Sequence, residues 1–170
     1  MRRVAIVVVL LCAFVACSSR NAGSSTDGRA KVVRVIDGDT IVVQVSGHEE
    51  HVRLIGIDTP ETHKPGTAVE CYGPEASAHL SQLIPAGSEV RLERDRESRD
   101  VYGRLLAYVY RASDGLFLEL EMLQAGFAGP LAIAPNTTHR AELDHAADRA
   151  RADGRGLWAA CGGFHVPGGG

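Results

Sequence analysis

The apolar positions near the start of the folded region follow the two-residue period of β-strands. β-Branched runs at 31–36 and 41–45 flank the turn-forming sequence Asp37-Gly38-Asp39-Thr40, and a third run covers 51–57. Three strands in a row at this spacing predict an antiparallel meander.

Helical spacing replaces strand spacing further along the chain. A helix is expected to open at Gly73-Pro74-Glu75 and to end before Pro85. Two more strands are expected at 89–93 and 104–110, followed by helices at 117–125 and 138–153, the last capped by Asn136 or Thr138. This order predicts an α+β fold, and a small closed or half-closed barrel with helical cover fits it. Periodicity alone does not separate that barrel from other α+β arrangements.

The first 16 residues indicate an export signal. Arg2 and Arg3 precede an apolar run at 4–15 that is too short to span a bilayer. The run ends in Phe14-Val15-Ala16-Cys17, which resembles a bacterial lipobox with Phe14 at the position where leucine is usual. We therefore expect a signal peptide over 1–16, lipidation of Cys17 and a membrane-anchored lipoprotein at the cell envelope. A secreted protein without lipid and an uncleaved anchor are the alternatives.

The remaining chain is expected to form one domain. Residues 17–28 are small and polar and predict a flexible tether, residues 29–162 form the domain, and residues 163–170 form a loose glycine-rich tail. Removal of the signal leaves 16 basic and 21 acidic side chains, a net charge of −5. Bulk attraction to nucleic acid is excluded by this sign, so a polyanion site would need a local basic cluster, a bound cation or both.

The four cysteines separate by position. Cys12 lies in the signal and Cys17 is the lipidation site, which leaves Cys71 and Cys161. A disulfide is the default interpretation for a pair of cysteines in an exported protein. Closing the loop between Cys71 and Cys161 would stabilise the fold by about 4–5 kcal/mol in the chain-entropy model. A metal site is the weaker alternative, because neither cysteine has a CxxC or Cys/His neighbour.

Acidic residues cluster at the predicted strand ends. Asp37 and Asp39 occupy the first turn, and Asp58 and Glu61 follow the third strand. In a meander these two ends lie side by side, and four close carboxylates call for a cation. Oxygen ligands favour calcium, magnesium or manganese over zinc. Either cluster alone is more often a solvated turn than a metal site.

Two arginines favour a phosphate-handling site. Arg53 lies on the third strand, and Arg104 follows Tyr102-Gly103 at the start of the fifth. Carboxylates that bind a metal, together with paired guanidinium groups, suit a phosphoester substrate. A surface strand arginine without a role is the alternative for Arg104.

Five ordered segments resemble the staphylococcal nuclease (thermonuclease) family. They are VVRVIDGDTIVV at 32–43, VRLIGIDTPET at 52–62, CYGPEASAHL at 71–80, DVYGRLLAYVY at 100–110 and NTTH at 136–139. Their order along the chain is far more specific than any one of them. The resemblance implies a five-stranded OB-type β-barrel with three helices, and a hydrolase that acts as an endonuclease on DNA or RNA and leaves 3′-phosphorylated products.

The resemblance also implies roles for individual residues. Calcium is expected on Asp39, Asp58 and the backbone carbonyl of Thr59. Glu61 is expected to act as general base, Arg53 and Arg104 to bind phosphate, and Tyr102 to contact substrate. Asp37 is expected to structure the turn or to lie in the outer shell of the metal. Nucleic acid is the expected partner, with the membrane through the lipid anchor, and no obligate protein partner is evident.

The sequence departs from the family pattern around the substrate. Val101 replaces a phosphate-contacting lysine, and Ala132 and Ala134 replace tyrosines that flank the base. Four arginines near the fourth strand suit either compensating charge or a solvated face; they are Arg91, Arg94, Arg96 and Arg99. The seven histidines form no site by spacing, so surface or packing roles are expected.

A catalytically weak nucleic-acid-binding module and a surface lipoprotein for adhesion are the alternative functions.

Overall fold

The computed structural model describes residues 28–62 and 68–168. Within these residues the chain forms seven strands and four helices. In chain order they are β1 (Arg29–Asp37), β2 (Thr40–Val45), β3 (His48–Leu54), β4 (Gly56–Asp58), α1 (Gly73–Leu83), β5 (Glu89–Glu93), β6 (Leu105–Arg111), α2 (Leu118–Gln124), β7 (Gly129–Leu131), α3 (Arg140–Ala152) and α4 (Leu157–Ala160). The predicted α+β class is confirmed.

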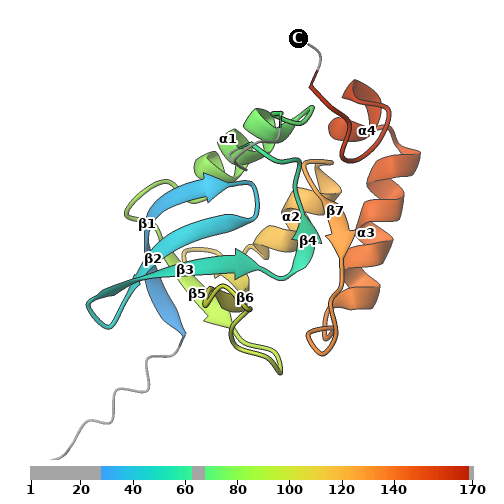
Figure 1. The fold of residues 1–170 in the computed structure, drawn as a ribbon. Coiled ribbons are helices and arrows are strands. Elements are labelled where there is room, and N and C mark those ends of the chain that lie inside the picture. Colours follow the sequence, from blue (N-terminus) through green and yellow to red (C-terminus); the bar gives the residue numbers. More distant parts are fainter. Residues whose placement is uncertain (1–27, 63–67, 169–170) are drawn as a thin grey trace, which may run out of the picture.

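Five strands close into a barrel in the order β1-β2-β3-β6-β5 (Figure 1). The antiparallel meander β1-β2-β3 is confirmed, β3 pairs with β6 in parallel, and β1 pairs with β5 to close the barrel. Register shifts lie within β1, between Val32 and Arg34 and between Val35 and Asp37. Such irregularities bend a strand, and this bending helps a small sheet to close.

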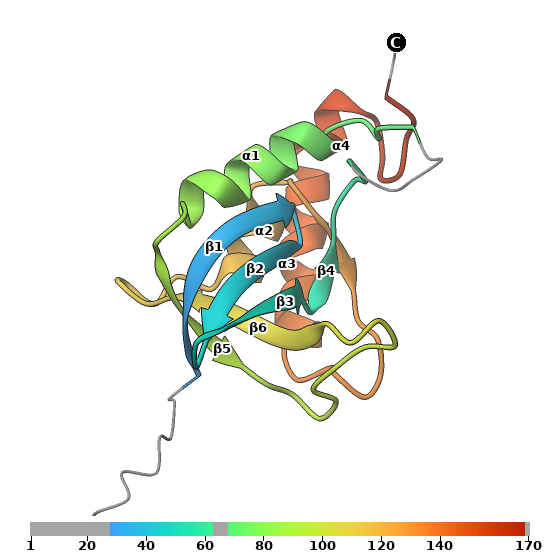
Figure 2. The ribbon, with the colours of Figure 1, turned by 60° about the vertical axis from the view of Figure 1, so that its left-hand side comes forward.

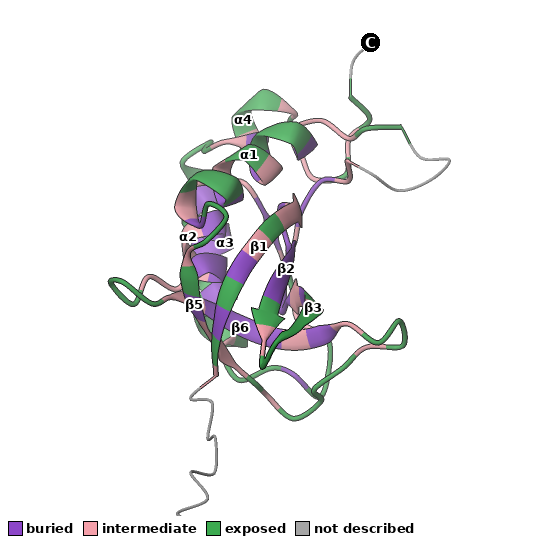
Figure 3. Cartoon of the chain, turned by 90° about the vertical axis from the view of Figure 1, so that its left-hand side faces the viewer, coloured by how far each residue is buried: buried purple, intermediate pink, exposed green. Residues whose placement is uncertain are grey.

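One core joins the barrel to the three longer helices. Along β2 the side chains of Ile41, Val42 and Val43 are fully buried, and Figure 3 shows most of this strand as buried. The helices contribute Ala76 and Leu80 from α1, Leu118, Met122 and Leu123 from α2, and Leu143, Ala146 and Ala147 from α3. This shared packing holds the β1–β2 turn and the end of β3 in fixed positions.

The third strand begins and ends three residues earlier than the sequence predicts, because β3 covers His48–Leu54. The expected strand at 51–57 is divided, because β3 ends at Leu54 and β4 begins at Gly56 with φ +90°. Glycine adopts this conformation without the steric cost of a Cβ. β4 then leaves the barrel and pairs with β7 in a separate two-stranded sheet. The break was hidden from the pattern because Leu54, Ile55 and Ile57 are all buried.

The helices confirm three predicted segments and add a short fourth, α4. α1 packs on β1 across one end of the barrel, whereas α3 packs on α2 and on the β4–β7 pair (Figure 1, Figure 2). The predicted cap of the last long helix is wrong, since α3 begins after His139, which makes no side-chain cap hydrogen bond. The Asn136 side chain instead bonds to the backbone N–H and carbonyl of Glu97.

A disulfide joins Cys71 to Cys161, whose Cα atoms lie 6.0 Å apart, so the expected pairing is confirmed and the metal alternative is wrong. In the described ranges, no helix has the length and apolar character that crossing a membrane requires. The predicted signal at 1–16, Cys17 and residues 17–27 of the tether lie outside the described residues.

Candidate active site

The turn between β1 and β2 presents Asp39 to the segment after β4. Oδ2 of Asp39 accepts hydrogen bonds from the backbone N–H of Thr59 at 3.0 Å and from its hydroxyl at 3.1 Å. Gly38 permits this approach, because a Cβ there would lie 2.8 Å from Cγ2 of Thr59. Asp37 stabilises the turn by accepting the Asp39 N–H at 3.2 Å. Asp39 is only 6% exposed, which rules out the solvated-turn alternative for this residue.

Arg53 on β3 joins the two predicted metal ligands. Its Nη2 lies 2.9 Å from Oδ1 of Asp58 and 3.0 Å from Oδ2 of Asp39. Its Nη1 donates to the carbonyl of Leu54 at 2.7 Å, and the side chain is 13% exposed. The two carboxylate oxygens therefore converge on one nitrogen atom in a poorly solvated place. The β2–β3 register sets Arg53 opposite Thr40, next to Asp39.

A polar cavity of about 220 Å³ collects nearly all the predicted site residues. It is lined by Asp37, Asp39, Thr40, Arg53, Asp58, Thr59, Pro60, Glu61 and Arg104. The structure thus brings the expected base, the two expected phosphate-binding arginines and the three expected metal ligands around one space. Tyr102 lies outside it, in a neighbouring pocket described below.

Glu61 is held by contacts from its own loop. The Glu61 N–H donates to Oε2 of Glu70 at 3.0 Å, and Oε1 of Glu61 accepts the N–H of Thr62 at 3.1 Å. The side chain is half-buried and faces the cavity. A carboxylate in this position is able to accept a proton from a molecule in the cavity.

Asp100 fixes Arg104 before β6 begins. Oδ2 of Asp100 accepts the Nε–H of Arg104 at 2.7 Å, while Oδ1 accepts the backbone N–H groups of Tyr102 at 3.0 Å and Arg104 at 2.9 Å. The Arg104 guanidinium lies 5.6 Å from the centre of the Tyr102 ring. Asp100 was not among the predicted site residues, although an aspartate that opens a turn before Gly103 is a usable signal.

The carboxylates of the cavity lie close together and are poorly solvated. Burial raises the pKa of Asp37 to about 7, and the adjacent carboxylate of Asp39 adds to the rise. Burial also raises the pKa of Asp58 above its ordinary value, against the opposing effect of Arg53. Desolvation and like charge both disfavour the ionised form, and a further cation would relieve both effects.

A divalent cation fits this acidic side of the cavity. The converging oxygens of Asp39 and Asp58 are hard ligands of the kind that calcium and magnesium prefer. Within 28–62 and 68–168, no three Asp, Glu, His or Cys side chains are arranged to hold a metal ion by themselves. The calcium site that the family resemblance implies would combine Asp39 and Asp58 with the backbone carbonyl of Thr59 and water.

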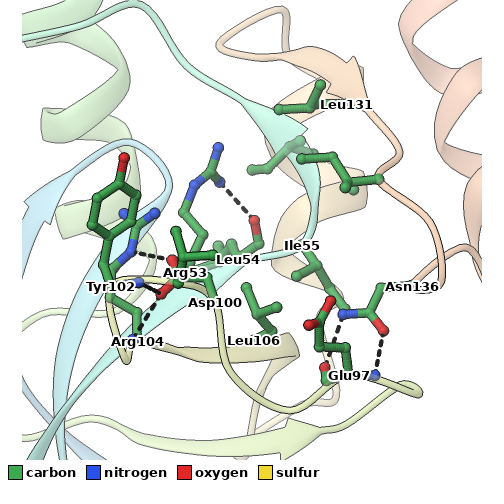
Figure 4. Close-up of a pocket in the computed structure, with 14 residues that line it drawn as sticks. Arg53, Leu54, Ile55, Glu97, Asp100, Tyr102, Arg104, Leu106, Leu131 and Asn136 are labelled. Atoms are coloured by element: carbon green, nitrogen blue, oxygen red, sulfur yellow. Dashed lines mark hydrogen bonds and ion pairs between the residues drawn. The ribbon is translucent and has the colours of Figure 1, made fainter.

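A second pocket, of about 320 Å³, shares Arg53 and Arg104 with the polar cavity. Figure 4 shows the residues that line this second pocket. Its other walls are largely aliphatic, with Leu54, Ile55, Ile57, Leu106, Leu131 and Ile133, and Tyr102 stands at its edge with 83% exposure. Ala132 and Ala134 do not line this pocket, whereas Leu131 and Ile133 do. An apolar wall beside two guanidinium groups suits a ligand with an anionic part and a flat apolar part.

The C-terminal segment also reaches the site. His165 places Nε2 3.1 Å from Oδ2 of Asp58 and Nδ1 2.7 Å from Oε2 of Glu70. The glycine-rich composition predicts a loose tail here, and the spacing of the histidines predicts only a surface or packing role for His165. No motif signals the contact, because His165 and Asp58 are 107 positions apart in the chain.

Two arginines of the fourth-strand region are engaged in ion pairs. Arg91 pairs with Glu93 at 2.9 Å, and Arg99 pairs with Glu50 at 2.8 Å. Neither arginine lines the polar cavity or the apolar pocket. For these two residues the solvated-face interpretation fits better than compensating charge.

The chain matches the family model described as "Staphylococcal nuclease homologue" over residues 51–160, a segment that contains Arg53, Asp58, Glu61 and Arg104. It is 40% identical to a thermonuclease of Staphylococcus intermedius over 155 residues, covering 89% of this chain and 90% of that protein. It is 38% identical to a thermonuclease of Staphylococcus hyicus over 160 residues, covering 92% and 93%. Endonuclease YncB of Bacillus subtilis (strain 168) is 39% identical over 131 residues, covering 76% and 61%.

Proposed function

Because the chain belongs to the staphylococcal nuclease family, we propose that it is a calcium-dependent nuclease that hydrolyses phosphodiester bonds of DNA, RNA or both. The products would carry 3′-phosphates. The observation that carries the proposal is the convergence of Arg53, Arg104 and Glu61 with three aspartates around one polar cavity.

The two arginines bind and stabilise the phosphate. Arg53 comes from β3 and Arg104 immediately precedes β6, the strand that pairs with β3, and both side chains line the cavity. Each can donate to non-bridging phosphate oxygens. Negative charge grows on these oxygens in the transition state, where fixed donors contribute most to the rate.

Glu61 accepts the proton of the attacking water. The water oxygen forms a bond to phosphorus while the bond from phosphorus to the 5′ oxygen breaks. The leaving 5′ oxygen takes a proton from solvent, and Glu61 later returns its proton to solvent. Proton transfer by a positioned carboxylate is typically worth about 10²–10⁴ in rate.

The acidic residues would hold the cation. Calcium bound by Asp39, Asp58 and the Thr59 carbonyl would polarise the phosphoryl group and offset its charge. Thr59 keeps Asp39 in place with two hydrogen bonds, and Asp37 keeps the turn in place with one.

The apolar pocket receives the nucleoside next to the scissile phosphate. Leu131 and Ile133 offer aliphatic surface to a base, and Tyr102 offers a ring to stack on. Stacking is worth about 1–3 kcal/mol per base and tolerates any sequence. We therefore expect weak base selectivity.

The test is incubation of the purified protein with DNA and with RNA, in calcium and in excess chelator. Cleavage should require calcium, and the fragments should support primer extension only after phosphatase treatment removes their 3′-phosphates. A folded protein that binds DNA in calcium but never cleaves it would establish the binding-module alternative instead.

Export and anchoring are proposed from the sequence of the first 17 residues. The Cys71–Cys161 disulfide supports an oxidising compartment for the domain. Metabolic labelling with a radioactive fatty acid should mark the parent protein and not the Cys17→Ser variant. Release of unlabelled parent protein into the medium would favour a cleaved signal without lipid.

A further inference from the structure

The C-terminal segment, residues 161–168, is fastened to the chain just before α1. The disulfide holds it at Cys71. The N–H of Cys71 donates to the carbonyl of Val166 at 2.9 Å, the N–H of Gly168 donates to the carbonyl of Val69 at 3.1 Å, and Glu70 and Pro167 form an antiparallel bridge. This attachment places the segment beside the loop that carries Glu61.

His165 stands at the centre of this attachment and connects two parts of the active site. One ring nitrogen contacts Oδ2 of Asp58, and the other contacts Oε2 of Glu70. The same Oε2 of Glu70 accepts the backbone N–H of Glu61. A continuous chain of contacts thus runs from Asp58, the expected metal ligand, through His165 and Glu70 to the expected general base.

Incidental surface contact is the simpler explanation, since the His165 side chain is 48% exposed. Three observations speak against it. Both ring nitrogens have carboxylate partners. The backbone of His165 has φ +56°, which costs energy in a residue with a Cβ and persists only when neighbours hold it. Phe164 packs on Gly129, the strand partner of Asp58, and so holds the C-terminal segment next to Asp58.

We propose that His165 is a positioning residue that orients Asp58 for calcium binding, and that the Cys71–Cys161 disulfide acts on the site by holding His165 there. Oδ1 of Asp58 faces Arg53 and Oδ2 faces His165, so the plane of the carboxylate is set from both sides. Ligand carboxylates that lose such a partner typically bind metal about 10–100-fold more weakly. The inference rests on the proposed function, because it takes Asp58 as a calcium ligand.

The experiment compares His165→Ala with the parent protein. Cation affinity is measured by terbium(III) luminescence titration and by calcium calorimetry, and kcat and KM for DNA are measured at saturating calcium. We expect cation affinity to fall about 10-fold and kcat to fall with KM nearly unchanged. His145→Ala, the same change at an exposed residue of α3, is the matched control and should leave every quantity unchanged.

The disulfide is tested with the double variant Cys71→Ser/Cys161→Ser, alone and combined with His165→Ala. The double variant should lose as much cation affinity as His165→Ala, and adding His165→Ala should cause no further loss. Thermal melts establish that each variant is folded at the assay temperature. If the double variant unfolds, His165→Ala in the disulfide-bonded chain still decides the positioning role.

The outcomes separate this inference from the proposed function. A parent protein that is active with calcium, together with a His165→Ala variant within twofold of it in cation affinity and kcat, overturns the positioning role alone. A further tenfold loss on adding His165→Ala to the double variant shows that the disulfide does not act through His165. A parent protein that binds neither terbium nor calcium overturns both proposals.

Discussion

Nη2 of Arg53 lies 2.9 Å from Oδ1 of Asp58, and the two side chains are only 13% and 26% exposed. In the structure this guanidinium is the cation that compensates Asp58 and, on the same nitrogen, Asp39. Arg53 therefore supports the site twice, as a partner of the acids and as an expected ligand of phosphate.

Replacing Arg53 should destabilise the metal-free protein and make it depend on calcium for stability. We expect Arg53→Gln to lower the free energy of unfolding by about 3 kcal/mol without calcium. This value is at the lower end of the range for breaking a buried ion pair, because Asp58 is still partly exposed. Added calcium should restore more stability in this variant than in the parent. Urea unfolding with and without calcium measures both effects, with Arg91→Gln in a surface pair as control. If calcium raised the free energy of unfolding equally in the parent and in Arg53→Gln, this expectation would be contradicted.

Replacing Glu61 should separate catalysis from folding. Glu61→Gln is close to isosteric and cannot take up a proton at neutral pH, so we expect kcat to fall about 10²–10⁴-fold with DNA binding largely retained. Single-turnover cleavage, a binding titration and a thermal melt measure the three properties. Glu75→Gln on the exposed face of α1 is the control. Cleavage by Glu61→Gln within a few-fold of the parent would remove Glu61 from the mechanism.

Asp100 should act through Arg104. In Asp100→Asn the charge-assisted hydrogen bond to Nε of Arg104 is weakened or lost, so the guanidinium is less well oriented. We expect kcat/KM to fall about tenfold, roughly the 1.4 kcal/mol expected for one charged hydrogen bond. Calcium affinity should be unchanged, since Asp100 does not line the acidic cavity. A fall in calcium affinity equal to the fall in kcat/KM would show general disruption instead.

Calcium should support activity far better than magnesium. The ligand set of Asp39, Asp58 and one backbone carbonyl leaves a loose coordination sphere that suits the larger ion, whereas magnesium demands near-ideal octahedral geometry. DNA cleavage is measured with each ion after chelator treatment and dialysis. Equal rates in magnesium alone would count against the calcium assignment.

The buried Glu119 on α2 should make the free energy of unfolding depend on pH. Its carboxylate is fully buried and accepts the N–H of Val109 at 3.0 and 3.1 Å, and burial raises its pKa well above the ordinary value of 4.5. The folded protein therefore holds a proton that the unfolded chain releases above about pH 4.5. The contribution of Glu119 to the free energy of unfolding consequently falls as the pH rises toward the pKa of the folded state.

Glu119→Gln should remove this dependence. Relative to the parent, the variant should gain stability as the pH rises above about 4.5. Urea unfolding at several pH values measures the difference. Glu121→Gln, at a partly exposed position of the same helix, serves as the comparison. Identical slopes for parent and Glu119→Gln would mean that Glu119 does not titrate between these values.

The sequence by itself predicted most of the barrel strands and the meeting of the two acidic strand ends. The Asp37–Thr40 turn joins two adjacent strands and the third strand pairs with the second, so the strand order was enough to predict that this turn lies beside the end of the third strand, where the structure places Arg53. Asp58 and Glu61 follow within eight positions of Arg53. Information of this kind is local, because the hydrophobic pattern sets the register of neighbouring strands and the register sets which side chains meet.

Only the tertiary structure decided the contacts between distant segments. The break at Gly56 was hidden because the residues on both sides of it are buried. The aliphatic pocket wall brings Leu131 and Ile133 together with Leu54 of β3. The contact between His165 and Asp58 joins positions 107 residues apart, in a segment that the Cys71–Cys161 disulfide attaches to the chain before α1. A periodic pattern reports which face of an element is buried, but not which remote loop covers it. Which remote loop covers a given face is decided only when the whole chain packs.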